Sequence, residues 1–218
     1  MKQLIFKFPF KTNYNEKDFY VSSGNFKAYQ LIESCPNWPD KWLNIYGPQG
    51  CGKTHLANIL KSKINAVLIE AKNITDSFIP IIEKYECVII DNYHSNIDEN
   101  ILYSILNHTK QLNKYILINS KTSISELQPT LKDLTSRLKS FIGIGIELPN
   151  DDLLRVIISK SFSDKQIDLN IKNLEYIIKN IDRSYDKAFN FVKKIDNLSL
   201  SSGKSININL IKKVLENE

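Results

Sequence analysis

The stretch of sequence that decides the fold is Gly47-Pro48-Gln49-Gly50-Cys51-Gly52-Lys53-Thr54. It matches the phosphate-binding P-loop pattern G-x-x-x-x-G-K-[ST] at every fixed position. An apolar stretch, residues 42–46, precedes the loop, and a helical pattern follows it, which is the strand–loop–helix context that a P-loop requires. Glycines let the backbone N–H groups turn toward phosphate oxygens, and the N-terminus of the following helix favours negative charge.

The polar side chains that end this segment have predictable roles. Lys53 is expected to reach the β- and γ-phosphates of a nucleotide, and the Thr54 hydroxyl is expected to bind Mg²⁺. The predicted cofactor is therefore a nucleoside di- or triphosphate, such as ADP or ATP, with Mg²⁺. The predicted cofactor-binding residues of this segment are Gly47, Pro48, Gln49, Gly50, Cys51, Gly52, Lys53, Thr54 and His55.

Short apolar runs alternate with helical patterns on both sides of this segment. The runs predict strands at residues 43–46, 66–70, 87–91, 115–119 and 142–147. The intervening patterns predict helices near residues 54–63, 77–84, 98–111 and 131–139. Continuous apolar strands that alternate with helices favour an α/β fold, in which helices cover both faces of a parallel sheet.

The pattern becomes purely helical after Pro149. Asn150 or Asp151 can cap a helix that runs to about residue 162, and further helices are predicted at 173–179, 184–198 and 208–215. In the third of these, the predicted buried face carries Ala188, Phe189, Val192 and Ile195. We therefore expect an N-terminal tail at 1–12, an α/β nucleotide-binding base at 13–148 and a small helical lid at 149–218.

Composition narrows the class of protein. The formal net charge of +5 permits an acidic partner, but the lysines are spread along the chain, which favours a solvated surface over a DNA-binding face. Cysteines at 35, 51 and 87 and histidines at 55, 94 and 108 show no pairing or metal-ligand spacing, so a reducing cytoplasm is expected. The first residues lack the apolar core of a signal peptide, and no segment is long enough to span a membrane.

A second nucleotide-site motif is Cys87-Val88-Ile89-Ile90-Asp91, an apolar run that ends in a carboxylate, as a Walker B strand does. Asp91 is expected to face the P-loop and to share the Mg²⁺ with Thr54, although an aspartate can also simply end a strand. Many P-loop ATPases have a second carboxylate at the next position, where this chain has Asn92. Because an amide cannot act as a general base, weak intrinsic hydrolysis is predicted.

Three further polar residues are candidates for contact with phosphates. Asn119 ends a predicted strand and is placed to contact a γ-phosphate or the attacking water, or it is an ordinary strand terminator. Arg137 lies beside an apolar stripe and is a candidate arginine finger, or a surface arginine in an ion pair. Arg183 precedes a lid helix and is a candidate phosphate ligand, although Lys179 and Lys187 lie near it.

Three segments carry a resemblance to a known family. Residues 45–56 closely resemble the P-loop of the DnaA replication initiators, residues 131–138 are similar to their arginine-finger box, and residues 182–189 resemble their lid motif. The resemblance covers nearly the whole chain and implies an AAA+ P-loop base followed by a helical lid. It places the family's arginine finger on Arg137 and its lid arginine on Arg183.

The chain departs from a typical DnaA, because a DnaA continues into a DNA-binding domain and begins with a further domain. A base and lid alone resemble the Hda branch of the family, whose members are regulatory inactivators of replication initiation. Gln3-Leu4-Ile5-Phe6 is similar to the peptide by which that branch docks on the DNA polymerase sliding clamp. Leu4 and Phe6 would be its apolar anchors and the Gln3 amide its hydrogen-bonding group, whereas a first strand or core tether is the alternative.

The resemblance implies a mechanism. A nucleotide-bound protein on the clamp would present Arg137 in trans to ATP on DnaA, while Lys53, Thr54, Asp91 and Arg183 hold its own nucleotide. The implied partners are DnaA and the clamp, with self-association through the finger face and only indirect contact with DNA. The alternative is an active AAA+ ATPase, such as a helicase loader or a truncated DnaA-like initiation factor that contacts DNA. A small-molecule kinase is a more distant alternative, because the lid contains little arginine.

Overall fold

A computed structural model describes residues 14, 16–94, 97–203 and 205–216. Its internal contacts divide the chain into two compact units: a base unit, Tyr14–Glu147, and a helical unit that begins at Leu148. Each unit has a hydrophobic core of its own. The two units are therefore described separately.

The base unit contains a five-stranded parallel sheet. In chain order the strands are β1 (Trp42–Tyr46), β2 (Ala66–Glu70), β3 (Cys87–Tyr93), β4 (Tyr115–Ser120) and β5 (Ile142–Gly145). Their order across the sheet is β2-β3-β4-β1-β5, and every neighbouring pair is parallel. Strand β4 therefore lies between β1, which leads into the P-loop, and β3, which carries Asp91.

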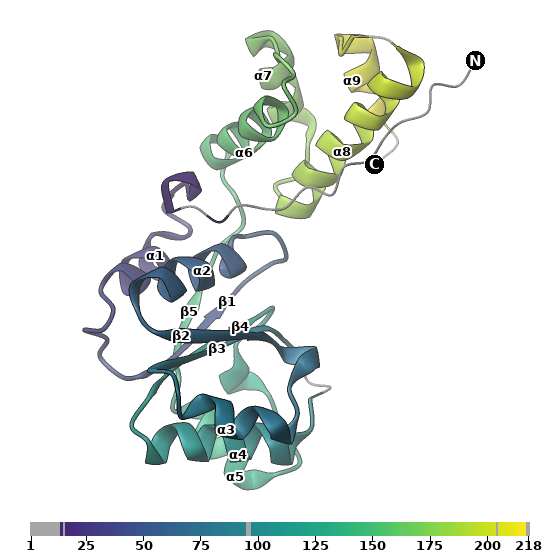
Figure 1. The fold of residues 1–218 in the computed structure, drawn as a ribbon. Helices are drawn as coiled ribbons and strands as arrows, with labels where there is room; N and C mark the ends of the chain where they lie inside the picture. The colour runs from purple at the N-terminus through teal and green to yellow at the C-terminus, as the bar shows by residue number, and fades with distance from the viewer. Residues whose placement is uncertain (1–13, 15, 95–96, 204, 217–218) are drawn as a thin grey trace. The chain divides into compact units, whose positions relative to one another are not determined.

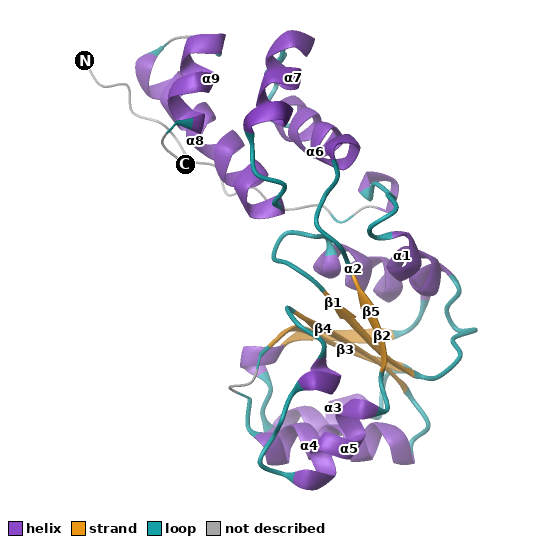
Figure 2. Cartoon of the chain, turned by 180° about the vertical axis from the view of Figure 1, so that it is seen from behind, coloured by secondary structure: helices purple, strands orange, loops and turns teal. Residues whose placement is uncertain are grey.

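Helices cover both faces of the sheet, as Figure 1 and Figure 2 show. One face carries α1 (Phe26–Glu33) and α2 (Lys53–Lys63), and the other carries α3 (Ile79–Ile82), α4 (Glu99–Gln111) and α5 (Lys132–Lys139). Short 3-10 helices lie at η1 (Glu16–Asp18), η2 (Ala71–Asn73), η3 (Asp76–Phe78) and η4 (Ile124–Glu126). The central residues of β3 and β4 are buried, as continuous apolar strands predict. The predicted fold class is confirmed.

Several boundaries differ from the sequence prediction. Helix α1 was not predicted at all. Strand β5 ends at Gly145 instead of 147, because the chain then leaves the sheet and Glu147 N donates to Gly24 O at 3.1 Å. The helix predicted at 77–84 is reduced to the 3-10 turn η3 and the short α3, which has a proline in its first turn.

The helical unit consists of α6 (Asp151–Ser163), α7 (Ile171–Asn180), α8 (Tyr185–Ser202) and α9 (Ile208–Leu215). Each helix begins after a polar N-cap whose side chain accepts a backbone N–H: Asn150, Asn170, Ser184 and Asn207. No helix among the described residues is long and apolar enough to cross a membrane.

One prediction about the core of the helical unit was wrong. Phe189 is 44% exposed, whereas Phe191 is fully buried with Ala188, Val192 and Ile195. Residues three and four positions apart share one face of a helix. Phe191 has that spacing from both Ala188 and Ile195, whereas Phe189 has it, among these residues, only from Val192 and is turned toward solvent.

Candidate functional site

The P-loop joins the end of β1 to the start of α2. Gly50 and Gly52 have φ angles of +80° and +96°, in the left-handed region that side chains disfavour. A Cβ atom on Gly52 would lie 2.9 Å from the Phe19 ring. Gly52 is also the N-cap of α2, so the first free N–H groups of that helix face the loop. The segment therefore has the backbone geometry of an anion-binding turn.

Lys53 is folded back over this loop. Its Nζ donates to Gly47 O and to Pro48 O, both at 2.8 Å, and lies 3.6 Å from Cys51 Sγ. These contacts hold the ammonium group at the P-loop itself. Burial raises the pKa of the Cys51 thiol, which keeps this thiol in its neutral form beside the lysine. Gln49 and Gly50, at the tip of the loop, are exposed.

Three side chains from different elements meet next to the P-loop. Thr54 Oγ1, on α2, donates to Asp91 Oδ2 on β3 at 2.7 Å. Asn119 Nδ2, on β4, donates to Asp91 Oδ1 at 2.9 Å and to Lys53 O at 3.0 Å. Asp91 is 2% exposed and Asn119 is fully buried. The insertion of β4 between β1 and β3 places Asn119 in this cluster.

The cluster fits a magnesium nucleotide. Thr54 and Asp91 supply the hydroxyl and carboxylate oxygens that Mg²⁺ prefers, and the remaining ligands of such an ion are usually phosphates and water. No group of three or more acidic, histidine or cysteine ligands is found in the described part of the chain. Asn119 Oδ1 is buried and accepts no hydrogen bond from another described residue, so it can accept one from a water molecule beside a bound nucleotide.

Asn92 lies outside this cluster although it follows Asp91 directly. Its φ angle is +54°, its side chain is exposed, and the register between β3 and β4 shifts between Ile90 and Tyr93. Asparagine tolerates this left-handed conformation better than most residues. The position after Asp91 therefore forms a bulge whose side chain makes no bond to the Thr54–Asp91–Asn119 cluster.

An aromatic group beside the P-loop was not predicted from the sequence. The His55 ring meets Phe19 and Tyr14 edge-on, at centroid distances of 5.3 and 5.5 Å, and Phe19 stacks on Tyr29 at 5.7 Å. Phe19 also closes the space next to Gly52. The only sequence signal was the aromatic content of residues 14–29, which shows no helical or strand spacing.

Arg137 lies on α5 next to the buried Leu134 and Leu138. Its side chain is partly exposed and makes no ion pair or hydrogen bond with any other residue that the structure describes. Ser140 donates to its carbonyl oxygen through both N–H and Oγ. The alternative that the sequence left open, a surface arginine held in an ion pair, finds no support among the described contacts.

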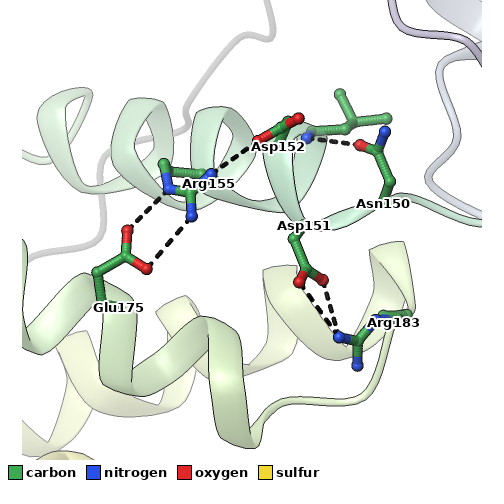
Figure 3. Close-up of polar contacts among 7 residues, drawn as sticks. Asn150, Asp151, Asp152, Arg155, Glu175 and Arg183 are labelled. Carbon is green, nitrogen blue, oxygen red and sulfur yellow. Dashed lines mark hydrogen bonds and ion pairs between the residues drawn. The ribbon is translucent and has the colours of Figure 1, made fainter.

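Arg183 belongs to the helical unit and is paired there. Figure 3 shows its pairing with Asp151. Arg183 Nη2 lies 2.9 Å from Asp151 Oδ1 and 3.3 Å from Oδ2, and the Arg183 side chain is 57% exposed. The neighbouring Asp152 binds a different cation, Arg155, which also forms a two-point contact with Glu175. Lys187, the alternative cation on α8, lies 3.9 Å from Asp182.

The predicted docking residues Gln3, Leu4, Ile5 and Phe6 lie outside the described residues. Two hollows of the base unit, of about 560 and 490 Å³, share Asn113, Lys114 and Tyr115, which precede or begin β4. They therefore lie at the amino ends of the strands. In parallel α/β sheets ligands bind at the carboxyl ends, where the P-loop cluster is found.

Comparison with known proteins places these features in context. The family described as RNA helicase matches residues 43–126. The chromosomal replication initiator protein DnaA of Borrelia garinii subsp. bavariensis is 26% identical over 268 residues, covering 98% of this chain and 55% of that protein. The chain spans about half the length of the curated relatives it matches.

Solved structures agree on the fold. Domain III of the Thermotoga maritima replication initiation protein DnaA has a TM-score of 0.76 at 18% identity, covering 96% of this chain and 98% of that one. AMPPCP-bound DnaA from Aquifex aeolicus has a TM-score of 0.65 at 21% identity, covering 84% and 65%. The chain has a DnaA-like AAA+ fold, consisting of a P-loop base and a helical C-terminal part.

Proposed function

We propose that this chain is a nucleotide-bound regulator of chromosomal replication initiation, which stimulates ATP hydrolysis on DnaA in trans through Arg137. The observation that carries the proposal is the state of Arg137: a partly exposed arginine on the base unit, whose side chain has no ionic partner among the described residues. An arginine that enters a neighbouring nucleotide site accelerates phosphoryl transfer by roughly 10³–10⁵-fold in well-studied systems.

The protein's own nucleotide has a structural role in this proposal. Lys53, Thr54, Asp91 and Asn119 would hold ADP or ATP with Mg²⁺, and Arg183 would contribute from the helical unit. The exposed amide of Asn92 supplies no general base next to Asp91, which supports slow turnover. A regulator that uses bound nucleotide to shape a surface does not require fast hydrolysis.

The remaining parts of the proposal concern location and partners. Residues Gln3–Phe6 would dock on the DNA polymerase sliding clamp in the cytoplasm, which would concentrate the protein at replicating DNA. Contact with DNA would then be indirect. Self-association through the face that carries Arg137 is compatible with this role.

The test is ATP turnover by DnaA, with and without this protein, in the presence of DNA-loaded clamp. The wild-type chain should accelerate turnover, and Arg137→Ala should lose the acceleration while it keeps nucleotide affinity and thermal stability. Lys139→Ala is the matched control, because Lys139 is an exposed cation on the same helix. Replacing Leu4 and Phe6 by alanine should abolish clamp binding and spare nucleotide binding.

Two results would contradict the proposal. Undiminished acceleration by Arg137→Ala would remove the finger role. Brisk ATP turnover by the purified chain alone would favour the alternative, an active AAA+ ATPase such as a helicase loader or a DnaA-like initiation factor that contacts DNA.

A further inference from the structure

Asn44 is a polar residue in the middle of an otherwise apolar strand. It lies on β1, shortly before the P-loop, and it is fully buried. Strands covered on both faces usually carry valine, isoleucine or leucine at such positions. A buried amide is unfavourable unless hydrogen bonds replace its contacts with water.

The Asn44 side chain makes three such bonds, all to the segment that contains the end of β4. Its Nδ2 donates to Ile118 O at 2.8 Å and to Ser120 Oγ at 2.9 Å, and its Oδ1 accepts from Ile124 N at 3.1 Å. Ser120 Oγ in turn donates to Thr122 O at 2.6 Å. The amide therefore ties the strand that leads into the P-loop to the end of β4 and to η4.

These partners lie on either side of Asn119. In the β1–β4 register Asn44 is opposite Ile118 and Ile45 is opposite Asn119, so Asn44 and Asn119 face opposite sides of the sheet. Asn44 thus fixes the backbone that carries Asn119, while the Asn119 side chain extends to Asp91 on the other side. The backbone carbonyl oxygen of Ser120 also accepts a hydrogen bond from Gly47 N at 3.2 Å, which connects the same backbone to the start of the P-loop.

We propose that Asn44 is a positioning residue that sets the preference of the site for a nucleoside triphosphate over a diphosphate. The inference rests on the proposed function, in which the cluster holds the nucleotide. Both Nδ2 hydrogens of Asn119 are used by Asp91 and Lys53, so its Oδ1 would contact the γ-phosphate through a bridging water molecule. Hydrogen bonds weaken steeply with misalignment, so a displaced Asn119 loses contact with that phosphate first. The α- and β-phosphates keep the loop N–H groups, and the β-phosphate also keeps Lys53. The end of β1 keeps a second anchor, because Ile146 N donates to Tyr46 O at 2.7 Å.

The test compares the affinities of AMPPCP and ADP, each with Mg²⁺, by calorimetry. Asn44→Leu has a similar volume and removes all three bonds; it should lower the AMPPCP-to-ADP affinity ratio by about tenfold, with ADP affinity nearly unchanged. Thr109→Val is the matched control. It removes another fully buried polar group of the base unit, whose Oγ1 donates to Ile105 O on α4, and it should leave the ratio unchanged.

Two further variants separate the possible failures. Asn119→Ala should lower the ratio as Asn44→Leu does, and the double variant should lower it no further. Ser120→Ala, which removes one partner of Asn44, should cause a smaller loss and replaces Asn44→Leu if that variant fails to fold. An unchanged ratio in Asn119→Ala would overturn the γ-phosphate contact and the inference with it. A lowered ratio in Asn119→Ala with unchanged ratios in Asn44→Leu and Ser120→Ala would overturn the positioning role alone.

Discussion

Thr54 Oγ1 donates a hydrogen bond to Asp91 Oδ2 at 2.7 Å, so the first turn of α2 is joined to the end of β3. The two oxygens lie where the cluster would hold Mg²⁺, and Asp91 keeps a second bond from Asn119. These two hydrogen bonds therefore fix the position of the Asp91 carboxylate relative to α2 and β4.

Asp91→Asn tests this arrangement. The variant keeps the size of the side chain but removes its charge, so nucleotide affinity in Mg²⁺ should fall by roughly 10–100-fold, as it does when groups that support a metal site are lost. Affinity for ADP in EDTA should change little. The measurement is calorimetry with and without Mg²⁺. An equal loss in both conditions would show that Asp91 supports the loop and not the ion.

Gly52→Ala should abolish nucleotide binding and destabilise the chain. A side chain at φ +96° is strained, by about 1–2 kcal/mol for the left-handed region, and the new Cβ would lie 2.9 Å from Phe19. Gly203→Ala is the control, because its φ is +64° and no atom lies within 4 Å of the added Cβ. Urea unfolding and ADP titration of both variants separate the backbone strain from the steric clash with Phe19. Equal losses of stability in the two variants would argue against the clash.

Asp151→Asn should strengthen nucleotide binding through Arg183. The carboxylate of Asp151 holds the guanidinium that the proposed function assigns to phosphates, so removing its charge releases a competing anion. The pair is exposed and therefore weak, and a gain of only about two- to fivefold in ADP affinity is expected. Asp152→Asn, which removes the same charge from the partner of Arg155, should have no effect. A gain that persists in Asp151→Asn combined with Arg183→Ala would contradict the competition.

Acid should destabilise the base unit partly through Glu99. Hydrogen bonds from the backbone N–H groups of Thr130 and Leu131 lower the pKa of this carboxyl below its ordinary value. A depressed pKa in the folded state means that the stabilisation is present above the unfolded pKa of about 4.3 and is lost as the pH falls through the lower, folded value. Between pH 7 and pH 3, the free energy of unfolding should fall less steeply with falling pH for Glu99→Gln than for the wild-type chain. Identical pH dependences would exclude this contribution.

Local pattern was sufficient to predict the sheet and most of the cluster beside the P-loop. Lys53, Thr54, Asp91 and Asn119 were expected at one edge because parallel strands bring their carboxyl ends together. The strand order that inserts β4 between β1 and β3, and so brings Asn119 to Asp91, was not predicted. Whether these residues bind nucleotide stays a prediction.

The features that were missed depend on partners distant in sequence. The bonds of Asn44 join residues more than seventy positions apart, and no spacing rule reveals them. The pairing of Arg183 with Asp151 connects the starts of two lid helices in the same way. Phe189 and Phe191 are both apolar and each lies three or four positions from a buried residue, so the sequence pattern alone did not distinguish the buried one.

The path of the chain after β4 has a consequence for the effect of a single substitution. From Asn119 the chain passes through η4 to α5, so one uninterrupted segment carries both the side chain beside Asp91 and Arg137. Asn44 holds this segment in place through hydrogen bonds with Ser120 and Ile124, which precede α5 in the chain. A single buried substitution that removes these hydrogen bonds is thus expected to impair two functions. It would affect both the protein's own nucleotide site and its action on a partner.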